Sequence, residues 1–507
     1  MMKPYSGSFF AIACAVTLLS GNANASTYYQ SDIGVRSFSR GGAFIAGNDD
    51  LTAMFYNPAA LTRLKRSQVM VDVAGVQQFV TFQRTAFEGN GPLDPVTGVP
   101  SNIEYDEIQN KAPPYAIPHF GISSRFGLEK TTFAFGFYPP YAPDLSYDKD
   151  GSQRYSLIDV LVIQTALGPS VAHQFNDWIS VGVGVAWNLL IAEQELKVSV
   201  PFHKNQIRSE VIDGEIVTTI DSPTPNEDPS NDVGFRFAAK DASGISWNAG
   251  VMIEPPSHNW ALGFMVQPPV AFQTEGTMEA DFSNHSLHTD ELVGDYVILS
   301  ETSKDKMVRM DITMPLILKG GFAVRPTHKS EIELAGVWQN WSSIDKITIT
   351  DVNLKVDLNE DHSQEAAQME DVTITDDVEL PAEYQNSWSV RLGGQQALGD
   401  KWIARTGVFY ETSGIPDATQ SVSLVDGNKI GYGVGGSYKP NGDWSIDFGV
   451  SQSFPMDTDV TDSKLKQISI DALTGEFLEG TTIGNGKYSS NLLIFGAGVV
   501  WEFGKES

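Results

Sequence analysis

Hydrophobic and polar residues alternate with a period of two along many segments of this chain. In residues 179–191 the odd positions are large and apolar, whereas the even positions are small or polar apart from Leu190. Residues 430–438 and 444–451 alternate in the same way. Because successive side chains of a β-strand point to opposite faces, the pattern predicts strands with an apolar face and a small or polar face. A soluble sandwich seldom has so polar an inner face, so the pattern favours strands between lipid and a lumen.

The alternation predicts fourteen strands. They cover residues 68–82, 119–126, 131–139, 157–173, 178–197, 243–255, 259–275, 307–325, 329–349, 386–397, 401–413, 429–440, 443–455 and 489–503. Their connections alternate between about two to five and about fifteen to forty-five residues, like the periplasmic turns and external loops of outer-membrane barrels. We therefore expect an all-β protein, in which residues 68–507 form a fourteen-stranded antiparallel transmembrane β-barrel. It would cross the outer membrane of a Gram-negative cell many times.

Residues suited to tight turns fall at the tips of the short connections. They occupy positions 127–130, 176–177, 256–258, 325–328, 399–400 and 441–443. Several tryptophans lie beside these tips, namely Trp178, Trp260, Trp402 and Trp444. Their placement predicts an aromatic girdle near the periplasmic rim of the barrel.

Residues 1–25 have the pattern of a secretory signal peptide. Lys3 supplies the charged region, residues 9–19 the apolar core, and residues 23–25 a small-x-small cleavage site. Cys14 is the only cysteine of the chain and falls within this segment. The mature protein is therefore expected to contain neither a disulfide nor a thiolate site.

Residues 26–67 precede the first strand and show no alternation, which predicts a compact plug, or hatch, inside the lumen. Asp49 and Asp50 can cap a short helix that begins at Leu51. Asn57 is a candidate N-cap and Pro58 a first helical residue of a second turn.

The acidic composition limits the partners and chemistry of the chain. A net charge of −29 at pH 7 excludes nucleic acid as a natural partner, because a phosphate backbone requires a basic surface. The acidic segment 350–384 is interpreted as a solvated external loop. Neither a Gly-x-Ser-x-Gly motif nor histidines at metal-binding spacing occur in the sequence. We expect no enzyme, no cofactor and no specific metal site, although residues 457–462 have some of the spacing of a calcium loop.

Several short motifs resemble those of the FadL/TodX family of outer-membrane transporters. Residues 41–44, 49–50 and 54–61 resemble the N-terminal hatch signature of that family. Later stretches with the same resemblance are residues 154–155, 168–175, 341–345, 388–393 and 431–440. The resemblance implies a fourteen-stranded barrel plugged by a hatch of about forty residues, which carries long-chain fatty acids or aromatic hydrocarbons.

Lateral release into the membrane is the expected route for such a ligand. Each CH₂ group transferred from an apolar site into water costs about 0.8 kcal/mol, so release of a long chain into the periplasm is costly. A lateral exit requires a gap in the barrel wall, where the strand ladder is incomplete. Pro139 and Pro140 end the third predicted strand and cannot donate N–H groups, so they are candidate gate residues. The alternative is that they only shape an external loop.

Candidate ligand and hatch residues follow from these expectations. We assign Asn57 and Pro58 to holding the hatch. The apolar residues Phe44, Met54 and Phe55 are assigned to contact with the ligand, with packing as the alternative. Two basic residues, Arg154 and Lys319, are candidates for a carboxylate head group, with structural ion pairs as the alternative.

The sequence predicts a passive importer of a hydrophobic small molecule, with a long-chain fatty acid as the first choice. Aromatic hydrocarbons are the alternative substrate. A general porin for polar solutes and a surface adhesin or scaffold with long acidic loops are the alternative functions. We expect a monomer that contacts outer-membrane lipid and lipopolysaccharide, with periplasmic chaperones and the barrel-insertion machinery as transient partners implied by the resemblance.

Overall fold

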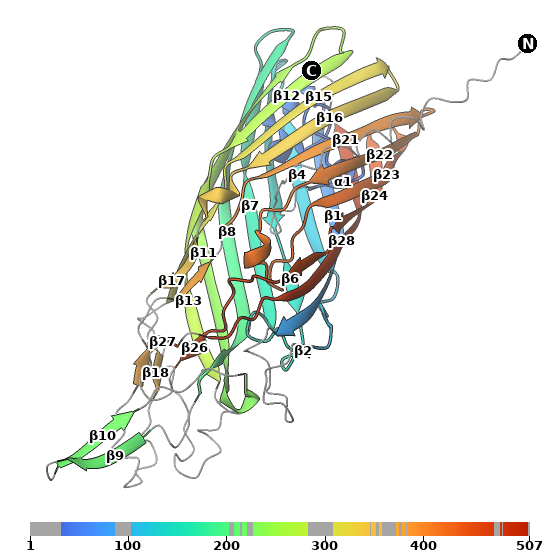
Figure 1. Cartoon of the computed structure of the whole chain (residues 1–507). Coiled ribbons are helices and arrows are strands. Elements are labelled where there is room, and N and C mark those ends of the chain that lie inside the picture. The colour runs from blue at the N-terminus through green and yellow to red at the C-terminus, as the bar shows by residue number, and fades with distance from the viewer. Residues whose placement is uncertain are drawn as a thin grey trace, which may run out of the picture.

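The computed structural model is a closed antiparallel β-barrel of fourteen strands (Figure 1), as the sequence predicted. It describes residues 32–86, 103–201, 207–212, 215–220, 227–281, 308–344, 346–350, 354–356, 372–374, 378–381, 383–470, 477–478 and 480–504. The predicted signal peptide lies outside these residues. The first and last strands close the barrel, because they pair from Ser67 opposite Phe503 to Arg84 opposite Gly486.

Several of the fourteen barrel strands are interrupted. The strands are β1 (Ser67–Ala86), β4 (Tyr115–Ser124), β5 (Thr131–Tyr141), β7 (Asp159–Gln174), β8 (Ile179–Ser199), β11 (Asp232–Ile253), β12 with β13 (Trp260–Gln267, Val270–Asp281), β14 with β15 (Val308–Met314, Ile317–Thr327), β16 with β17 (Ser330–Gln339, Lys346–Thr350), β20 with β21 (Val378–Pro381, Ser387–Leu398), β22 (Trp402–Glu411), β23 (Lys429–Asn441), β24 (Trp444–Pro455) and β28 (Gly486–Phe503).

Short elements complete the described chain. The additional strands are β2 (Ile103–Glu104), β3 (Ile108–Gln109), β6 (Asp144–Ser146), β9 (Ile207–Ile212), β10 (Glu215–Ile220), β18 (Leu354–Val356), β19 (Val372–Ile374), β25 (Thr458–Val460), β26 (Ser469–Ile470) and β27 (Phe477–Leu478). The helices are α1 (Val35–Phe38) and α2 (Ala53–Tyr56), and the 3-10 turns are η1 (Pro58–Arg63), η3 (Pro229–Asn231), η4 (Trp341–Ser343) and η6 (Asp417–Thr419). None of the helices in the described part of the chain is long and apolar enough to cross a membrane.

The two faces of the wall differ as the alternation predicted. Outward positions such as Val183, Val185 and Trp187 are exposed, whereas inward Asn188 is buried. Two of the tryptophans next to the short turns, Trp178 and Trp260, have ring centroids 6.1 Å apart. The outer face can therefore contact lipid around the barrel.

Three segments predicted as single strands are each divided in two. Residues 259–275 form β12 and β13, residues 307–325 form β14 and β15, and residues 329–349 form β16 and β17. The first two breaks contain proline, at Pro268–Pro269 and at Pro315. A proline has no N–H for the ladder, so strand pairing is interrupted at these positions. Hydrophobic alternation continues on both sides of the prolines and therefore did not reveal these breaks.

Residues 32–66, here called the hatch segment, lie against the inner faces of the strands (Figure 1). Glycines on the wall make this approach possible. A Cβ atom on Gly182 would lie 2.3 Å from the carbonyl carbon of Pro58, and one on Gly433 would lie 1.8 Å from the carbonyl oxygen of Phe38. Any larger side chain at these two positions would displace the hatch segment.

Candidate functional site

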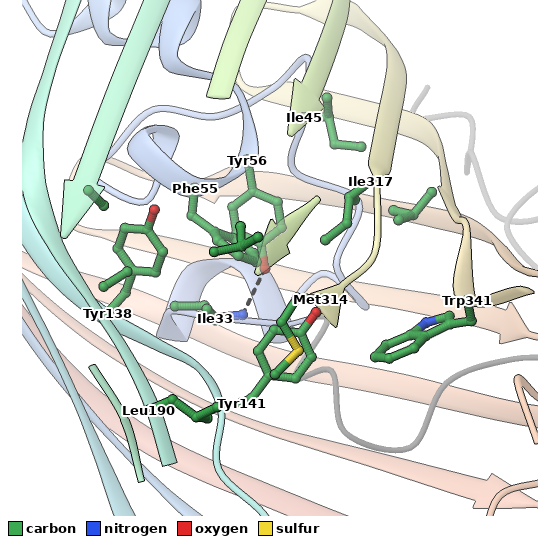
Figure 2. Close-up of a cluster of buried hydrophobic side chains, with 14 of the residues drawn as sticks. Ile33, Ile45, Phe55, Tyr56, Tyr138, Tyr141, Leu190, Met314, Ile317 and Trp341 are labelled. Atoms are coloured by element: carbon green, nitrogen blue, oxygen red, sulfur yellow. Dashed lines mark hydrogen bonds between the residues drawn. The ribbon is translucent and has the colours of Figure 1, made fainter. Parts of the chain in front are cut away.

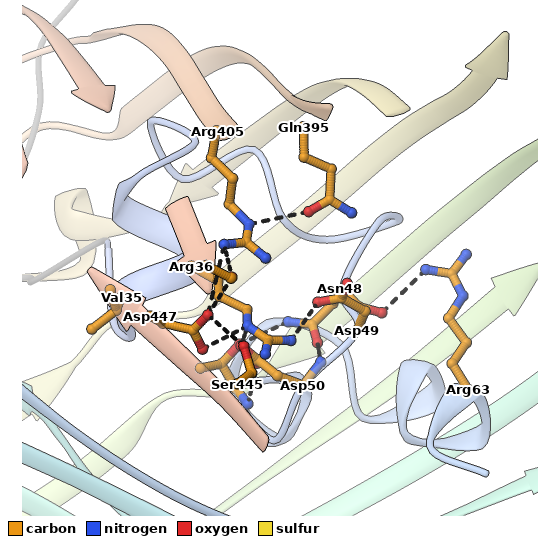
Figure 3. A network of polar contacts seen from close by, with 12 residues as sticks. Val35, Arg36, Asn48, Asp49, Asp50, Arg63, Gln395, Arg405, Ser445 and Asp447 are labelled. Atoms are coloured by element: carbon orange, nitrogen blue, oxygen red, sulfur yellow. Dashed lines mark hydrogen bonds and ion pairs between the residues drawn. The ribbon is translucent and has the colours of Figure 1, made fainter. Parts of the chain in front are cut away.

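Buried ion pairs join the hatch segment to the barrel wall. The Arg36 guanidinium donates through Nε to Asp447 Oδ2 at 2.9 Å and through Nη1 to Asp49 Oδ1 at 3.2 Å (Figure 3). Asp447 belongs to the inward set of β24, whose neighbours Ser437 and Ser445 donate to its other oxygen. This inward acid was visible in the alternation of residues 444–451, but its partner on the hatch segment was not.

A second attachment centres on Glu333 of β16. Its carboxylate accepts hydrogen bonds from the backbone N–H groups of Ile45, Ala46 and Gly47, at 2.7, 2.8 and 2.8 Å. Arg40 lies over the same strand, with Nη1 2.8 Å from Glu331 Oε1. One wall carboxylate therefore holds three consecutive amides of the hatch segment, an arrangement typical of a strong anion site.

A third attachment joins Arg391 of β21 to Asp32, the first described residue, over 2.6 Å. Arg391 also pairs with Glu411 of β22 over 2.7 Å. Sequence reasoning missed Arg36, Arg40 and Arg391. Their partners are hundreds of residues away in the chain, so no local pattern marks them.

Asp50 is a buried carboxyl within the hatch segment. The N–H and the hydroxyl of Thr52 both donate to Asp50 Oδ1, at 2.8 and 2.5 Å. Burial raises the pKa of Asp50 to about 6, and the nearby Arg36 guanidinium opposes that rise. Through its hydrogen bonds from Thr52, Asp50 caps the turn before α2. The helix α2 begins at Ala53 rather than at the expected Leu51.

Asn57 and Pro58 occupy the N-cap and first positions of η1, as the sequence indicated. Asn57 Oδ1 accepts from Ala59 N at 3.2 Å, and its Nδ2 donates to the Val251 carbonyl of β11 at 3.2 Å. One side chain thus caps a turn of the hatch segment and also ties it to the wall.

Replacing Asn57 with alanine is expected to weaken this attachment by about 1–3 kcal/mol, because one cap and one wall contact are lost. Limited proteolysis of the folded barrel should then cleave the hatch segment faster than in the wild type. Asn57→Ser is the matched control, since a serine keeps the capping oxygen. Equal cleavage of Asn57→Ala and wild type would contradict this role.

An apolar cluster fills the lumen next to the hatch segment (Figure 2). Phe44, Phe55 and Tyr56 contribute from the hatch segment, and Phe55 packs edge-on against Tyr138 of β5 with ring centroids 5.4 Å apart. Tyr141 packs against Trp341 at 6.3 Å in the same cluster. A lumen filled by aromatic and aliphatic side chains is suited to apolar ligands rather than to polar solutes.

The other sequence candidates have different surroundings. Lys319 Nζ donates to the Phe55 carbonyl at 3.2 Å and lies 3.5 Å from the centroid of the Phe55 ring. Met54 packs in a separate cluster against the inner wall. Arg154 pairs with Asp232 over 2.7 Å, donates to Tyr155 Oη and does not belong to the apolar cluster.

A pocket of roughly 610 Å³, including its part open to solvent, lies on the inner wall near the external loops. Its apolar lining includes Val76, Tyr115, Ala142, Pro143, Val425 and Leu492. Lys429 and Asp426 form its charged edge, with Nζ 2.9 Å from Asp426 Oδ1. Burial raises the pKa of Asp426 to about 6. We call this cavity the outer pocket.

The wall is incomplete next to the outer pocket. The β4–β5 ladder ends at Phe120 opposite Phe137, although both strands continue. Pro139 and Pro140 lie in a register shift between β5 and β7 and are buried, so they continue the strand inward rather than only ending it. Pro118 stands on the facing edge of β4. Prolines on both edges cannot donate the N–H groups that would complete the ladder.

The described residues contain no group of three or more His, Cys, Asp or Glu side chains that could hold a metal ion. Residues 457–462, which have some of the spacing of a calcium loop, belong to no such group in the part of the chain that is described. The acidic segment 350–384 falls largely outside the described residues.

Comparison with known proteins gives matches at three levels. A family described as outer membrane protein transport protein (OMPP1/FadL/TodX) matches residues 16–503. The long-chain fatty acid transport protein of Escherichia coli K12 is 31% identical over 68 residues, which is 13% of this chain and only 15% of that protein. A FadL homologue of Pseudomonas aeruginosa has a similar structure, with a TM-score of 0.69, 17% identity, and coverage of 94% of this chain and 100% of the other. The toluene transporter TodX of Pseudomonas putida is also similar, with a TM-score of 0.56 and 15% identity. The match covers 94% of this chain and 99% of the other.

Proposed function

The chain belongs to the OMPP1/FadL/TodX family of outer-membrane transport proteins for hydrophobic molecules, and we propose that its own substrate is a long-chain fatty acid. The ligand would enter passively from outside and occupy the outer pocket. Movement of the hatch segment would then let it leave sideways between β4 and β5. The apolar outer pocket with a lysine at its edge is the observation that carries this proposal.

The charged edge of the outer pocket supports a carboxylate ligand. Lys429 is shared by Asp426 at 2.9 Å and Glu411 at 3.3 Å, and Glu411 is also bound by Arg391. Because burial raises the pKa of Asp426 and so favours its protonated form, a fatty-acid carboxylate can take its place beside Lys429. The acyl chain would lie along Val76 and Leu492.

The break in the β4–β5 ladder supports lateral release. Tyr115 lies on one edge of the break and Pro143 just beyond the other, and both line the outer pocket. A chain that leaves by this route stays in apolar surroundings and avoids the cost of about 0.8 kcal/mol for each CH₂ exposed to water. Pro139 and Pro140 are thus assigned to the gate.

Replacing Lys429 with methionine is expected to lower the affinity for oleate about tenfold, because the carboxylate loses the cation that Lys429 supplies at the pocket edge (about 1.4 kcal/mol). Toluene, which has no charge, should bind as before. Asp426→Asn is the opposite variant and should bind oleate more tightly, since a competing carboxylate is removed. Affinities are measured by titration of the purified barrel. Equal losses for oleate and toluene would contradict a carboxylate site.

Uptake of labelled oleate by cells that lack their own transporter and express this chain tests the proposal directly. A folded barrel that takes up toluene but not oleate would move the substrate to aromatic hydrocarbons, which the names of structurally similar proteins such as the TodX toluene transporter favour. Uptake of neither, with a large steady current in planar bilayers, would favour a general porin. An adhesin would lose adhesion, and keep uptake, when residues 350–384 are deleted.

We propose that the protein acts without catalysis, as a monomer that contacts outer-membrane lipid and lipopolysaccharide. The exposed apolar face of the wall supports contact with lipid. The buried attachments of Arg36 and Glu333 support a plug that is intact within one chain. Light scattering of the purified barrel with its detergent contribution subtracted measures the oligomeric state.

A further inference from the structure

The wall is interrupted a second time, on the part of the barrel formed by β11, β12 and β13. β11 pairs with β12 as far as Ala249 opposite Val266, and with β13 from Lys240 opposite Glu275. Within these fully described stretches, none of residues 241–248 pairs with residues 267–274. The register is the same on both sides of the interruption. The strands therefore part and rejoin without slipping, which is a local opening of the ladder rather than a change of pairing.

Local backbone features cause this separation on each edge. Pro268 and Pro269 lie between β12 and β13 and donate no N–H. On β11 the register with β8 shifts between Asp241 and Gly244, as in a β-bulge. On each strand the buried, inward-facing positions switch between odd and even residue numbers here, for instance from Met265 to Phe272. Each strand therefore reverses once, within the opening, which set of its side chains faces inward.

Side chains satisfy backbone groups that the missing ladder leaves free. Asp241 Oδ2 accepts from the N–H of Gln273 at 2.9 Å, across the opening. The indole N–H of Trp187 donates to the Ala242 carbonyl at 2.5 Å. Because an unsatisfied backbone group in hydrocarbon costs several kcal/mol, an opening with its own partners is a stable part of the wall.

A second pocket, here called the wall pocket, reaches this opening from inside. It is lined by Met54 of the hatch segment, Tyr138 of β5, and Ser246, Trp247, Asn248 and Gln267 at the edges of the opening. Trp247 lines this pocket and is also 49% exposed on the outer surface. Ile245 beside it is 61% exposed. One residue, Trp247, therefore borders both the wall pocket and the outer surface.

Phe272 closes the opening. Its side chain is 1% exposed and belongs to the apolar cluster of the lumen. A Cβ atom on Gly244 would lie 2.6 Å from Phe272 Cε1, so the ring occupies the space that a side chain on β11 would otherwise take. A single ring on a rotatable side chain can leave this position without breaking any ladder bond.

Uncharged polar groups line the approach. Asn248 donates through Nδ2 to the Met54 carbonyl at 2.8 Å, and its buried Oδ1 has no partner among the described residues. Asn188 donates to Ser246 Oγ at 2.9 Å, and Gln164 donates to Asn188 at 3.0 Å. A free buried amide oxygen accepts from a hydroxyl or a protonated carboxyl group, whereas a carboxylate would be repelled. The Met54 contact also links this site to the position of the hatch segment.

We propose that the opening between β11 and β12/β13 is a second lateral exit, closed by Phe272 and separate from the break between β4 and β5. It releases hydrophobic molecules with an uncharged polar head, such as a protonated fatty acid, from the lumen past the wall pocket and into the membrane. This inference rests on the proposed transport function.

Photolabelling tests the route. The purified full-length barrel is irradiated with a fatty acid that carries a diazirine in its chain, at mildly acidic pH, and labelled peptides are mapped by mass spectrometry. Adducts on residues 241–248 and 267–274 that excess oleate removes are expected. The continuous β21–β22 ladder, from Ser389 to Leu398, is the internal control and should carry no adducts that oleate removes. Removable adducts confined to the outer pocket and the β4–β5 break would overturn the second exit.

Kinetics of a matched pair of variants test the closing residue. With the first exit sealed by replacement of its prolines, Phe272→Ala should raise residual oleate uptake several-fold. Phe82→Ala removes an equally buried ring from a continuous ladder and should not raise it. If Phe272→Ala fails to fold, as judged by the heat-modifiable gel shift, Phe272→Leu is compared instead. Equal uptake in the Phe272 and Phe82 variants would overturn the proposal. A wild type that neither takes up nor binds oleate or toluene would overturn the transport function itself.

Discussion

Replacing Pro118 and Pro139 with valine and Pro140 with threonine is expected to lower oleate uptake at least about tenfold, because restored N–H groups let β4 and β5 pair beyond Phe120 and seal the first exit. Oleate binding to the purified barrel should fall much less, since Lys429 and most of the outer-pocket lining are unchanged. Uptake is measured with labelled oleate in cells, and binding by titration.

A proline pair next to β4 provides the control for this experiment. Pro113 and Pro114 are exposed and precede the strand, so their replacement by valine and threonine should leave uptake unchanged. Unaltered uptake in the sealed variant, with a folded barrel, would show that β4–β5 is not the main route. Parallel losses of binding and uptake would instead mean that the substitutions damaged the pocket.

Replacing Glu333 with alanine is the second large change we expect. Three backbone N–H groups of residues 45–47 and the Arg40 guanidinium lose their buried acceptor, at a cost of about 3–5 kcal/mol for the attached state. The hatch segment should then leave its position often enough to produce frequent large openings in planar bilayers. The wild type should conduct little.

Glu331→Ala is the matched variant for this measurement. Glu331 lies on the same strand and pairs with Arg40, but it accepts none of the three amide hydrogen bonds. Its conductance should lie much closer to that of the wild type. Equal current in the two variants would show that the triple contact does not hold the plug, and deletion of residues 32–66 gives the current of an unplugged barrel for scale.

Much of the wall could be predicted because its physical cause is local. The alternation at residues 179–191 and 444–451 reflects lipid on one face and lumen on the other, and it gave the strand number and inner face correctly. Asn57 and Pro58 were also predictable, since an N-cap and its following proline depend on adjacent residues. The divided strands were not, because alternation continues on both sides of Pro268–Pro269 and Pro315 with a change of parity.

The site was predicted less completely. Phe44 and Phe55 do lie in the apolar cluster of the lumen, and their roles in ligand contact stay a prediction. Arg154 and Lys319 were chosen as candidates for a carboxylate head group because of their positive charge. In the structure each of them has partners within the protein. No local pattern marks Lys429 as a candidate, because only the folded chain brings it beside Val76 and Leu492.

The sequence by itself determined the class of this protein: period-two alternation and regular turn spacing require a lipid-facing barrel, and the hatch motifs point to the transporter family. Only the tertiary structure decided how the hatch segment is attached to the wall and where the strand ladder is interrupted. Arg36 binds Asp447, which is 411 residues away in the sequence, and Glu333 binds the backbone of residues 45–47, which begin 288 residues before it. The openings depend on which strand edges face each other, and register between distant strands is fixed by the closed barrel as a whole.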